Sequence, residues 1–242
     1  MALIVQKFGG SSVADTEKIR NICNIIAKAY DEGNQVVAVL SAQGDTTDDL
    51  IEKAKNINPC APAREMDMLL STGEQISVAL AAMCMHNMGY PVISLTGWQA
   101  GIRTTSEHSC AKIFDVEQNV IRRELNQSRI VLVAGFQGVD TSGNITTLGR
   151  GGSDTTAVSL AAWLKADVCQ IYTDVNGVYT ADPRMDSNAT KLDDMSYDEL
   201  LKLIRKGAQV MHEQSVITAK EFGIEFEVRS SFTGAPGTIV HP

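Results

Sequence analysis

The stretch Leu3-Ile-Val-Gln-Lys-Phe-Gly-Gly-Ser-Ser-Val13 joins a short apolar run to two glycines, with Lys7 close to the junction. An apolar, β-branched run of this length is typical of a buried strand. Isoleucines then recur at helical spacing at positions 19, 22, 25 and 26, after Asp15 as a candidate N-cap and before Gly33 as a candidate stop. The segment therefore predicts a strand, a glycine-rich turn and a helix.

The same alternation continues along the chain. Further strands are predicted at residues 36–40, 92–95, 130–134, 145–148, 168–173 and 225–229. Helices are predicted near residues 48–56, 64–88, 116–125, 153–165, 197–206 and 213–222. Strands that alternate with helices are typical of an α/β domain, in which helices cover a mainly parallel sheet.

Composition limits the function classes. The 242 residues are 44% hydrophobic, which is ample for one core, and the net charge of −8 excludes a broad basic face for nucleic acid. The five cysteines are scattered without CxxC spacing, so we expect reduced thiols in the cytoplasm rather than a disulfide framework or a zinc site. We expect no signal peptide and no apolar segment long enough to span a membrane.

The first glycine turn is a candidate phosphate site. Gly9 and Gly10 let the backbone approach an anion closely, and Lys7 adds a positive charge beside them. The pattern is neither GxxxxGK[ST] nor GxGxxG. A tight strand-to-helix turn with an exposed lysine explains the same residues, so this motif alone leaves both interpretations open.

A second glycine-rich segment spans residues 148–157, LGRGGSDTTA. We expect Ser153 or Asp154 to cap the helix that follows, and Gly151 and the first-turn amides to receive an anion. Arg150 is suited to a bidentate grip on a carboxylate. Asp154 has a second possible role, as the anion that orients Lys7. An ordinary loop before a capped helix is the alternative.

A third segment, residues 171–184, reads IYTDVNGVYTADPR. A strand ends at Thr173-Asp174, and ligands of open α/β sheets gather at the carboxyl ends of strands. Tyr179 is a candidate to flank a nucleotide base, and Arg184 a candidate to reach phosphate. An irregular surface loop is again the alternative.

Taken together, VQKFGGSSV, SAQGDTTDDLI, REMDMLLSTGE, AGFQGV, TTLGRGGSDTTA, YTDVNGVYTADPR, MSYDEL and VRSS…PGT resemble the aspartokinases of the amino-acid kinase superfamily, in the same order and over residues 3 to 240. The resemblance implies a three-layer αβα sandwich with an open, mainly parallel central sheet. It implies that residues 1–242 form the catalytic domain, and that ACT regulatory domains follow in a full-length form. It leaves a homo-oligomer open and implies no nucleic-acid or membrane partner.

The resemblance also implies an activity and its residues. ATP would phosphorylate the β-carboxylate of L-aspartate, the first step toward lysine, threonine and methionine, with Mg²⁺ held mainly by the nucleotide phosphates and no metal site in the protein. Lys7 and Asp154 would be catalytic. The nucleotide would meet Lys7, Gly9, Gly10, Ser11, Thr173, Asp174, Tyr179, Arg184 and Gln209. Aspartate would meet Ser41, Thr47, Glu74, Arg150, Gly151 and Ser153. Glu74 also suits the ammonium group of aspartate on chemical grounds, although an isolated glutamate in a helix usually faces solvent.

One departure affects the predicted nucleotide site. Many aspartokinases carry GAKV, whose lysine lies near the phosphates, whereas this chain has Gly207-Ala-Gln-Val210, with Gln209 at that position. Lys206 is a possible substitute. Three other functions stay open: a kinase for glutamate or N-acetylglutamate, a dinucleotide-dependent oxidoreductase, which the missing GxGxxG disfavours, and a non-catalytic nucleotide-binding subunit.

Overall fold

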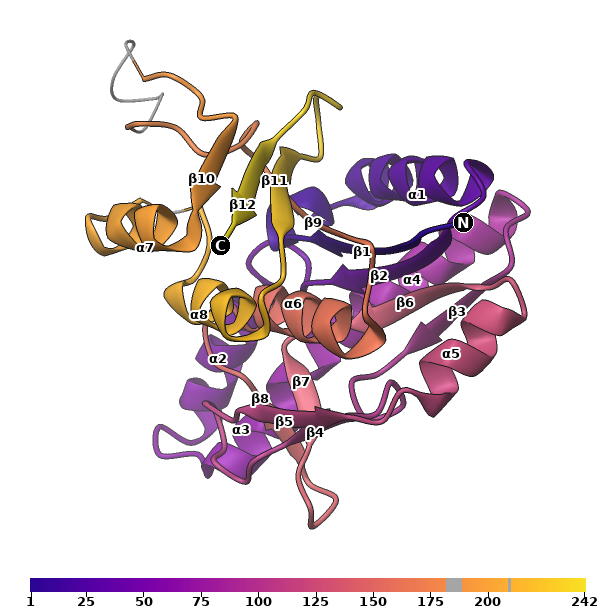
Figure 1. Ribbon diagram of the computed structural model, residues 1–242. Helices are drawn as coiled ribbons and strands as arrows, with labels where there is room; N and C mark the ends of the chain where they lie inside the picture. The colour runs from indigo at the N-terminus through magenta and orange to yellow at the C-terminus, as the bar shows by residue number, and fades with distance from the viewer. Residues whose placement is uncertain (182–188, 209) are drawn as a thin grey trace.

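The computed structural model describes residues 1–181, 189–208 and 210–242, and its centre is an eight-stranded sheet (Figure 1). The strands lie in the order β10-β12-β11-β9-β1-β2-β6-β3, and every neighbouring pair is parallel except β11 with β12. Their bounds are β1 Leu3–Phe8, β2 Gln35–Leu40, β3 Val92–Leu95, β6 Ile130–Ala134, β9 Val168–Thr173, β10 Asp194–Ser196, β11 Phe226–Ser230 and β12 Thr238–His241. The predicted open, mainly parallel sheet is confirmed.

Helices cover both faces of this sheet. One face packs against α1 (Thr16–Asp31) and α4 (Thr72–Asn87), and the other against α5 (Asn119–Asn126), α6 (Gly152–Leu164), α7 (Tyr197–Arg205) and α8 (Glu213–Phe222). Side chains of a strand alternate between faces, so Val37 and Val39 of β2 join one apolar core while Val36 and Leu40 join the other. This three-layer αβα arrangement is the predicted one.

A smaller sheet lies beside the carboxyl ends of the main strands, together with α2 (Thr46–Ile57) and α3 (Ala63–Leu70) (Figure 1). Its order is β5-β4-β7-β8, with bounds β4 Ile102–Thr104, β5 Ile113–Val116, β7 Gln137–Val139 and β8 Ile145–Thr147. The sequence predicted only β8, and it placed the start of the α5 helix too early, because Val116 belongs to β5. Strands of three or four residues are too short to show a two-residue period.

The predicted helix over residues 64–88 is two helices that meet at Ser71, which ends α3 and precedes α4. Together they span Ala63–Asn87, and an 18-residue window within them is apolar enough by length and composition to cross a membrane. The expectation that no such segment exists was therefore wrong. Half of that window is buried inside the protein, where Val78, Ala81 and Met85 pack with α1 against the sheet, so the segment is a core helix of the described fold.

The topology places ligands at the end of β1. The chain moves from β1 to β2 on one side, and β9 pairs with β1 on the other, so the strand order reverses at β1. In open α/β sheets such a reversal leaves a crevice at the carboxyl ends of the strands. The glycine turn that follows β1 at Gly9 lies there.

Candidate active site

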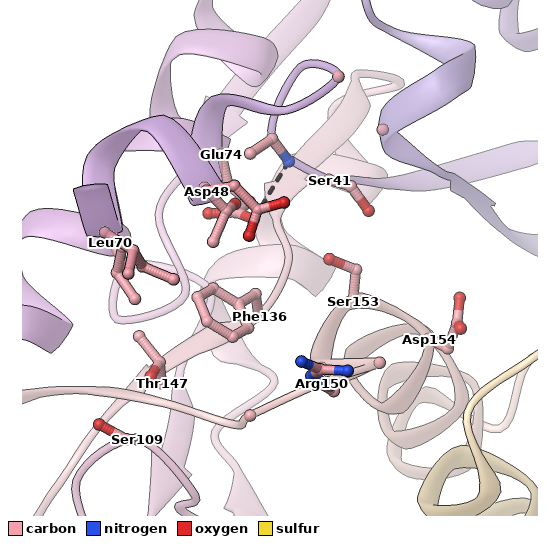
Figure 2. A pocket seen from close by; sticks show the side chains of 18 of the residues that line it. Ser41, Asp48, Leu70, Glu74, Ser109, Phe136, Thr147, Arg150, Ser153 and Asp154 are labelled. Carbon is pink, nitrogen blue, oxygen red and sulfur yellow. Dashed lines mark hydrogen bonds between the residues drawn. The ribbon is translucent and has the colours of Figure 1, made fainter. Parts of the chain in front are cut away.

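A cavity of about 480 Å³ opens at this end of the sheet (Figure 2). It brings together nine of the predicted site residues from four separate segments: Lys7, Gly10, Ser41, Thr47, Glu74, Arg150, Gly151, Ser153 and Asp154. Gly9, Ser11, Thr173, Asp174 and Tyr179 do not line it. Arg184 and Gln209 lie outside the described residues, so their predicted roles stay predictions.

Lys7 and Asp154 form an ion pair at the end of β1. The strand directs Lys7 toward α6, where Asp154 lies in the first turn, and Nζ lies 2.6 Å from Oδ1. The two side chains are 11% and 10% exposed, so little water screens the charges. The contact is an ion pair and not a well-directed hydrogen bond, because Oδ1 has no hydrogen-bond partner within good geometry. The predicted pairing of Asp154 with Lys7 is therefore present.

The glycine turn after β1 packs closely against the neighbouring loop. Residues Gly10–Ser12 form a short 3-10 helix, and Gly44 donates its N–H to the carbonyl of Gly10 at 3.1 Å. A Cβ on Gly10 would lie 2.9 Å from the carbonyl oxygen of Ala42, so only glycine permits this approach. The N–H of Gly9 is bonded to Tyr172 at 3.3 Å, and that amide is engaged within the fold.

The loop before α6 presents Arg150 between two left-handed glycines. Gly149 and Gly151 have φ of 75° and 70°, and Gly151 is the N-cap residue of α6. The expectation that Ser153 or Asp154 caps this helix was wrong, because both lie inside its first turn and the cap has no side-chain hydrogen bond. A side chain at Gly151 would overlap His212, which precedes α8. Arg150 is exposed and lies at the cavity wall (Figure 2).

Glu74 is buried at the opposite wall. It lies in the first turn of α4 and is 3% exposed, and its Oε1 accepts the N–H of Ala42 at 3.1 Å (Figure 2). Oε2 is buried without a hydrogen-bond partner among the described residues. Burial raises the pKa of this carboxyl from 4.5 to about 8, although hydrogen bonds from the backbone amides oppose the rise. Glu74 is thus a desolvated acid that forms no ion pair with any residue of the described part of the chain.

The predicted nucleotide segment lies beside the cavity at the end of β9. The Thr173 hydroxyl donates to Asp174 at 3.0 Å, and Ser231 donates its N–H to the Thr173 carbonyl at the same distance. Tyr179 forms an isolated antiparallel bridge with Lys191. β9 is the direct neighbour of β1, so these residues border the glycine turn without lining the cavity.

The family of the chain follows from comparison with known proteins. The sequence model of the amino acid kinase family matches residues 2–230. The chain belongs to the amino acid kinase family. It is 55% identical over 240 residues to an aspartokinase from Bacillus sp. (strain MGA3), and the match covers 99% of this chain and 58% of that protein. The chain thus spans little more than half the length of this relative.

Two solved structures share the fold of this amino acid kinase. Aspartate kinase from Synechocystis has a TM-score of 0.88 at 44% identity, and the match covers 99% of this chain and 40% of that one. E. coli aspartokinase III in complex with aspartate and ADP has a TM-score of 0.86 at 28% identity, with 99% and 64% covered. The predicted resemblance to the aspartokinases and the fold that it implied are confirmed.

Sequence reasoning missed several residues of the cavity in this amino acid kinase. Phe136 lies two residues after the end of β6, has a left-handed φ of 69°, and lies between the Glu74 and Arg150 walls (Figure 2). Asp48 of α2 extends toward the Glu74 end, and Ser109 and Thr147 form the wall below Leu70 (Figure 2). Phe136 had a signal in the sequence, since it lies in AGFQGV just after the end of a buried strand, but nothing in the sequence placed Ser109 there.

The charges of the cavity are separated. The carboxyl groups of Glu74 and Asp48 lie at one end, while Arg150 and Asp154 lie toward the other (Figure 2). Lys7 pairs with Asp154 and therefore belongs to the second end. A small ligand with an ammonium group and carboxylates matches this distribution, and a phosphate group matches the Lys7 end. No group of three or more His, Cys, Asp or Glu side chains that could hold a metal occurs within residues 1–181, 189–208 and 210–242.

Proposed function

We propose that this chain transfers the γ-phosphoryl group of ATP to the β-carboxylate of L-aspartate, giving 4-phospho-L-aspartate. One observation carries the proposal: a single cavity holds the Lys7–Asp154 pair and Arg150 at one end and, across it, the buried Glu74, whose Oε2 has no hydrogen-bond partner among the described residues. The aspartokinase relatives support it, as does the E. coli aspartokinase III structure in complex with aspartate and ADP.

The cavity can orient aspartate by its charges. Glu74 would bind the ammonium group, and Arg150 would hold the α-carboxylate through two parallel hydrogen bonds. Ser41, Thr47, Gly151 and Ser153 line the same space and would complete the aspartate site. The β-carboxylate would then point toward the Lys7 end, where the nucleotide phosphates are expected.

The reaction needs little chemistry from the side chains. The side-chain pKa of aspartate is about 3.9, so the nucleophile is already ionised at neutral pH and no general base is required. One oxygen of the β-carboxylate forms a bond to the γ-phosphorus, the bond from that phosphorus to the bridging oxygen breaks, and ADP leaves with the electron pair. Lys7 would neutralise charge on the transferred group, and Asp154 would hold Lys7 in place.

The nucleotide would lie across the ends of β1 and β9. Lys7, Gly9, Gly10 and Ser11 are proposed at the phosphates, and Thr173, Asp174 and Tyr179 along the remainder of the nucleotide, with Arg184 and Gln209. Mg²⁺ prefers oxygen ligands and is often held by substrate phosphates with few protein carboxylates. In that mode the nucleotide phosphates, and not a cluster of side chains, would hold the ion. When bound, the ion would offset the negative charge of the phosphates.

The test is an ADP-release assay with a panel of acceptors, run together with hydroxylamine trapping of the acyl phosphate. We expect L-aspartate to support ADP release and hydroxamate formation, and L-glutamate and N-acetyl-L-glutamate to support neither well. L-glutamate tests the selectivity for chain length, and N-acetyl-L-aspartate, which lacks the ammonium charge that Glu74 would bind, tests that contact when compared with L-aspartate. ADP release without hydroxamate would show simple ATP hydrolysis, and no ADP release would favour a non-catalytic binding subunit.

The proposal extends to the organisation of the chain. Both walls of the cavity come from residues 7–154, so we propose that residues 1–242 act as the phosphoryl-transfer domain. The five cysteines are free, which suits a reducing compartment, and we propose the cytoplasm as the site of the reaction. Expression of residues 1–242 alone, followed by the assay above, tests the first of these statements.

A further inference from the structure

Asp67 is a buried carboxylate behind the wall of the cavity. It lies in α3, is fully buried, and does not line the cavity itself. Its Oδ1 accepts the Thr147 hydroxyl at 2.6 Å and the Ser109 N–H at 3.1 Å. Its Oδ2 accepts the same N–H at 3.0 Å and the Nδ1–H of His108 at 2.7 Å. Three residues far from Asp67 in sequence therefore converge on one carboxylate.

Two of these partners line the cavity directly. Ser109 and Thr147 form its wall beside Leu70, on the way to the Arg150 loop (Figure 2). Thr147 ends β8, and Arg150 follows three residues later. The carbonyl of Ser109 lies 3.1 Å from where a Cβ on Gly149 would lie, so the two loops are in close contact. Movement of Ser109 would therefore be transmitted to the backbone next to Arg150.

The conformation of Ser109 requires support. Its φ is 67°, in the left-handed region that residues other than glycine rarely adopt. Both oxygens of Asp67 accept its N–H, which fixes the peptide in that orientation. The carbonyl of Thr147 accepts the N–H of Ala111 at 3.0 Å and ties the other end of the same loop to β8.

We propose that Asp67 is a positioning residue: with His108 it clamps the loop over residues 105–111 against β8 and so fixes the Arg150 end of the aspartate site. The expected effect on KM for aspartate rests on the proposed function. The expected effect on the order of the loops at residues 105–111 and 148–151 does not. Asp67 touches neither substrate nor nucleotide in this assignment.

The variant Asp67→Asn tests the clamp with almost no change in volume. Whichever way the amide turns, its NH2 faces the N–H of Ser109, because both carboxylate oxygens accept from that one donor. We expect at least a fivefold increase in KM for aspartate, a KM for ATP within twofold of the wild type, and a smaller decrease in kcat. His108→Leu removes one of the donors from outside the cavity, and we expect a twofold to threefold increase in the same KM.

Asp140→Asn is the matched control. Asp140 is also buried, at 5% exposure, and its Oδ1 accepts the N–H groups of Ser142 and Asn144 at 2.9 and 2.8 Å. It lies in the turn before β8 and does not line the cavity. If the β7–β8 hairpin were merely loosened, Asp67→Asn and Asp140→Asn would raise KM for aspartate equally. That result would overturn the proposal.

Hydrogen exchange of the ligand-free protein separates the two possible failures. We expect Asp67→Asn to speed exchange in residues 108–111 and 148–151 at least tenfold. Asp140 faces Ser106 at the start of the same loop, and we expect Asp140→Asn to leave residues 108–111 and 148–151 unchanged. If the wild type does not phosphorylate aspartate but this difference appears, the proposed function fails and the clamp stands. Unchanged exchange in both segments, or unchanged KM for aspartate in an active Asp67→Asn protein, would show that Asp67 is not a positioning residue. If that variant does not fold, the same readouts on His108→Leu decide.

Discussion

Replacing Glu74 by glutamine should make the ligand-free protein more stable, and the gain should grow with pH. Burial raises the pKa of this carboxyl from 4.5 to about 8, and its side chain is almost inaccessible to water. At about 1.4 kcal/mol per pH unit, that difference corresponds to roughly 5 kcal/mol for ionising Glu74 in the folded state. Glutamine has nearly the same shape and carries no charge at any pH.

The sign of the pH dependence follows from proton binding. Below pH 4.5 the carboxyl is protonated in both the folded and the unfolded protein, so its burial stabilises the fold fully. Between pH 4.5 and 8 the unfolded chain loses the proton while the folded protein keeps it, and the free energy of unfolding falls by up to about 1.4 kcal/mol per pH unit. Above pH 8 both states are ionised and the loss is complete.

Urea unfolding of the wild type and of Glu74→Gln at half-unit steps from pH 5 to 9 measures this difference. Glu124 supplies the control, since it is also buried but pairs with Arg123 and Arg129, which lower its pKa. Glu124→Gln should therefore destabilise the protein at neutral pH, and its effect should lessen as the pH falls through the carboxylate range. A stability gain for Glu74→Gln that does not change between pH 5 and 8.5 would refute the buried, cation-free carboxyl.

The same carboxyl links aspartate binding to proton release. At pH 7 a group with a pKa of about 8 is mostly protonated, whereas an ammonium group needs the carboxylate. Binding of aspartate should therefore release about one proton from the wild type at pH 7, and none from Glu74→Gln. Calorimetry in buffers of different ionisation enthalpy measures this number. Equal proton release from the two proteins would place the ammonium group elsewhere.

Three further outcomes are expected. Lys7→Ala should lower kcat by about 10²–10³-fold, the effect typical of losing a preorganised charge contact. The control Lys18→Ala breaks the exposed pair with Asp15 and should leave kcat unchanged. A normal kcat in a folded Lys7→Ala protein would contradict the assignment. Gly151→Ala should lower both Tm and activity more than Gly143→Ala does, because both glycines have positive φ but only Gly151 faces a neighbour, His212; equal losses would remove the steric argument. With ATP alone varied, Glu74→Gln should leave KM for ATP within twofold of the wild type, and a larger change would move Glu74 toward the nucleotide.

The long buried strands were predictable because each is rich in apolar and β-branched residues. Leu3–Phe8 and Val168–Thr173 were located to the residue, and Asp15 caps α1 through the N–H of Lys18 as expected. Apart from β8, the small sheet was not predicted, because β4 and β7 have three residues each and owe their pairing to distant segments. Periodicity records which face of an element is buried, and it contains nothing about a strand of three residues.

The site was predictable where its residues lie at the carboxyl ends of strands, because ligands of open α/β sheets bind there. The cavity brings together Lys7, Asp154 and Arg150. Lys7 precedes the glycine turn after β1, and the other two lie in the glycine-rich segment at the start of α6, so both glycine turns border the same cavity. The burial of Glu74 could not be read from its helix, since its neighbours in sequence have no clear apolar stripe. It results from Gly73, where a Cβ would lie 2.8 Å from the Cβ of Ala42, so that α4 begins directly against that loop. Such an approach is a property of two distant segments and not of either alone.

The ligand-free site contains buried polar atoms that the described residues do not satisfy, and we expect these atoms to select a substrate by its charges. Glu74 is desolvated without a cation, and the ion pair of Lys7 and Asp154 satisfies each charge only in part, since Oδ1 lacks a directed hydrogen bond. A ligand with an ammonium group at one end and an anion at the other relieves both conditions when it binds. A ligand that lacks the ammonium group leaves Glu74 to keep its proton, and a ligand that lacks the anion leaves Arg150 in water. Discrimination among amino acids should therefore come from the spacing between these two walls, which the contacts of Asp67 with Ser109 and Thr147 hold constant.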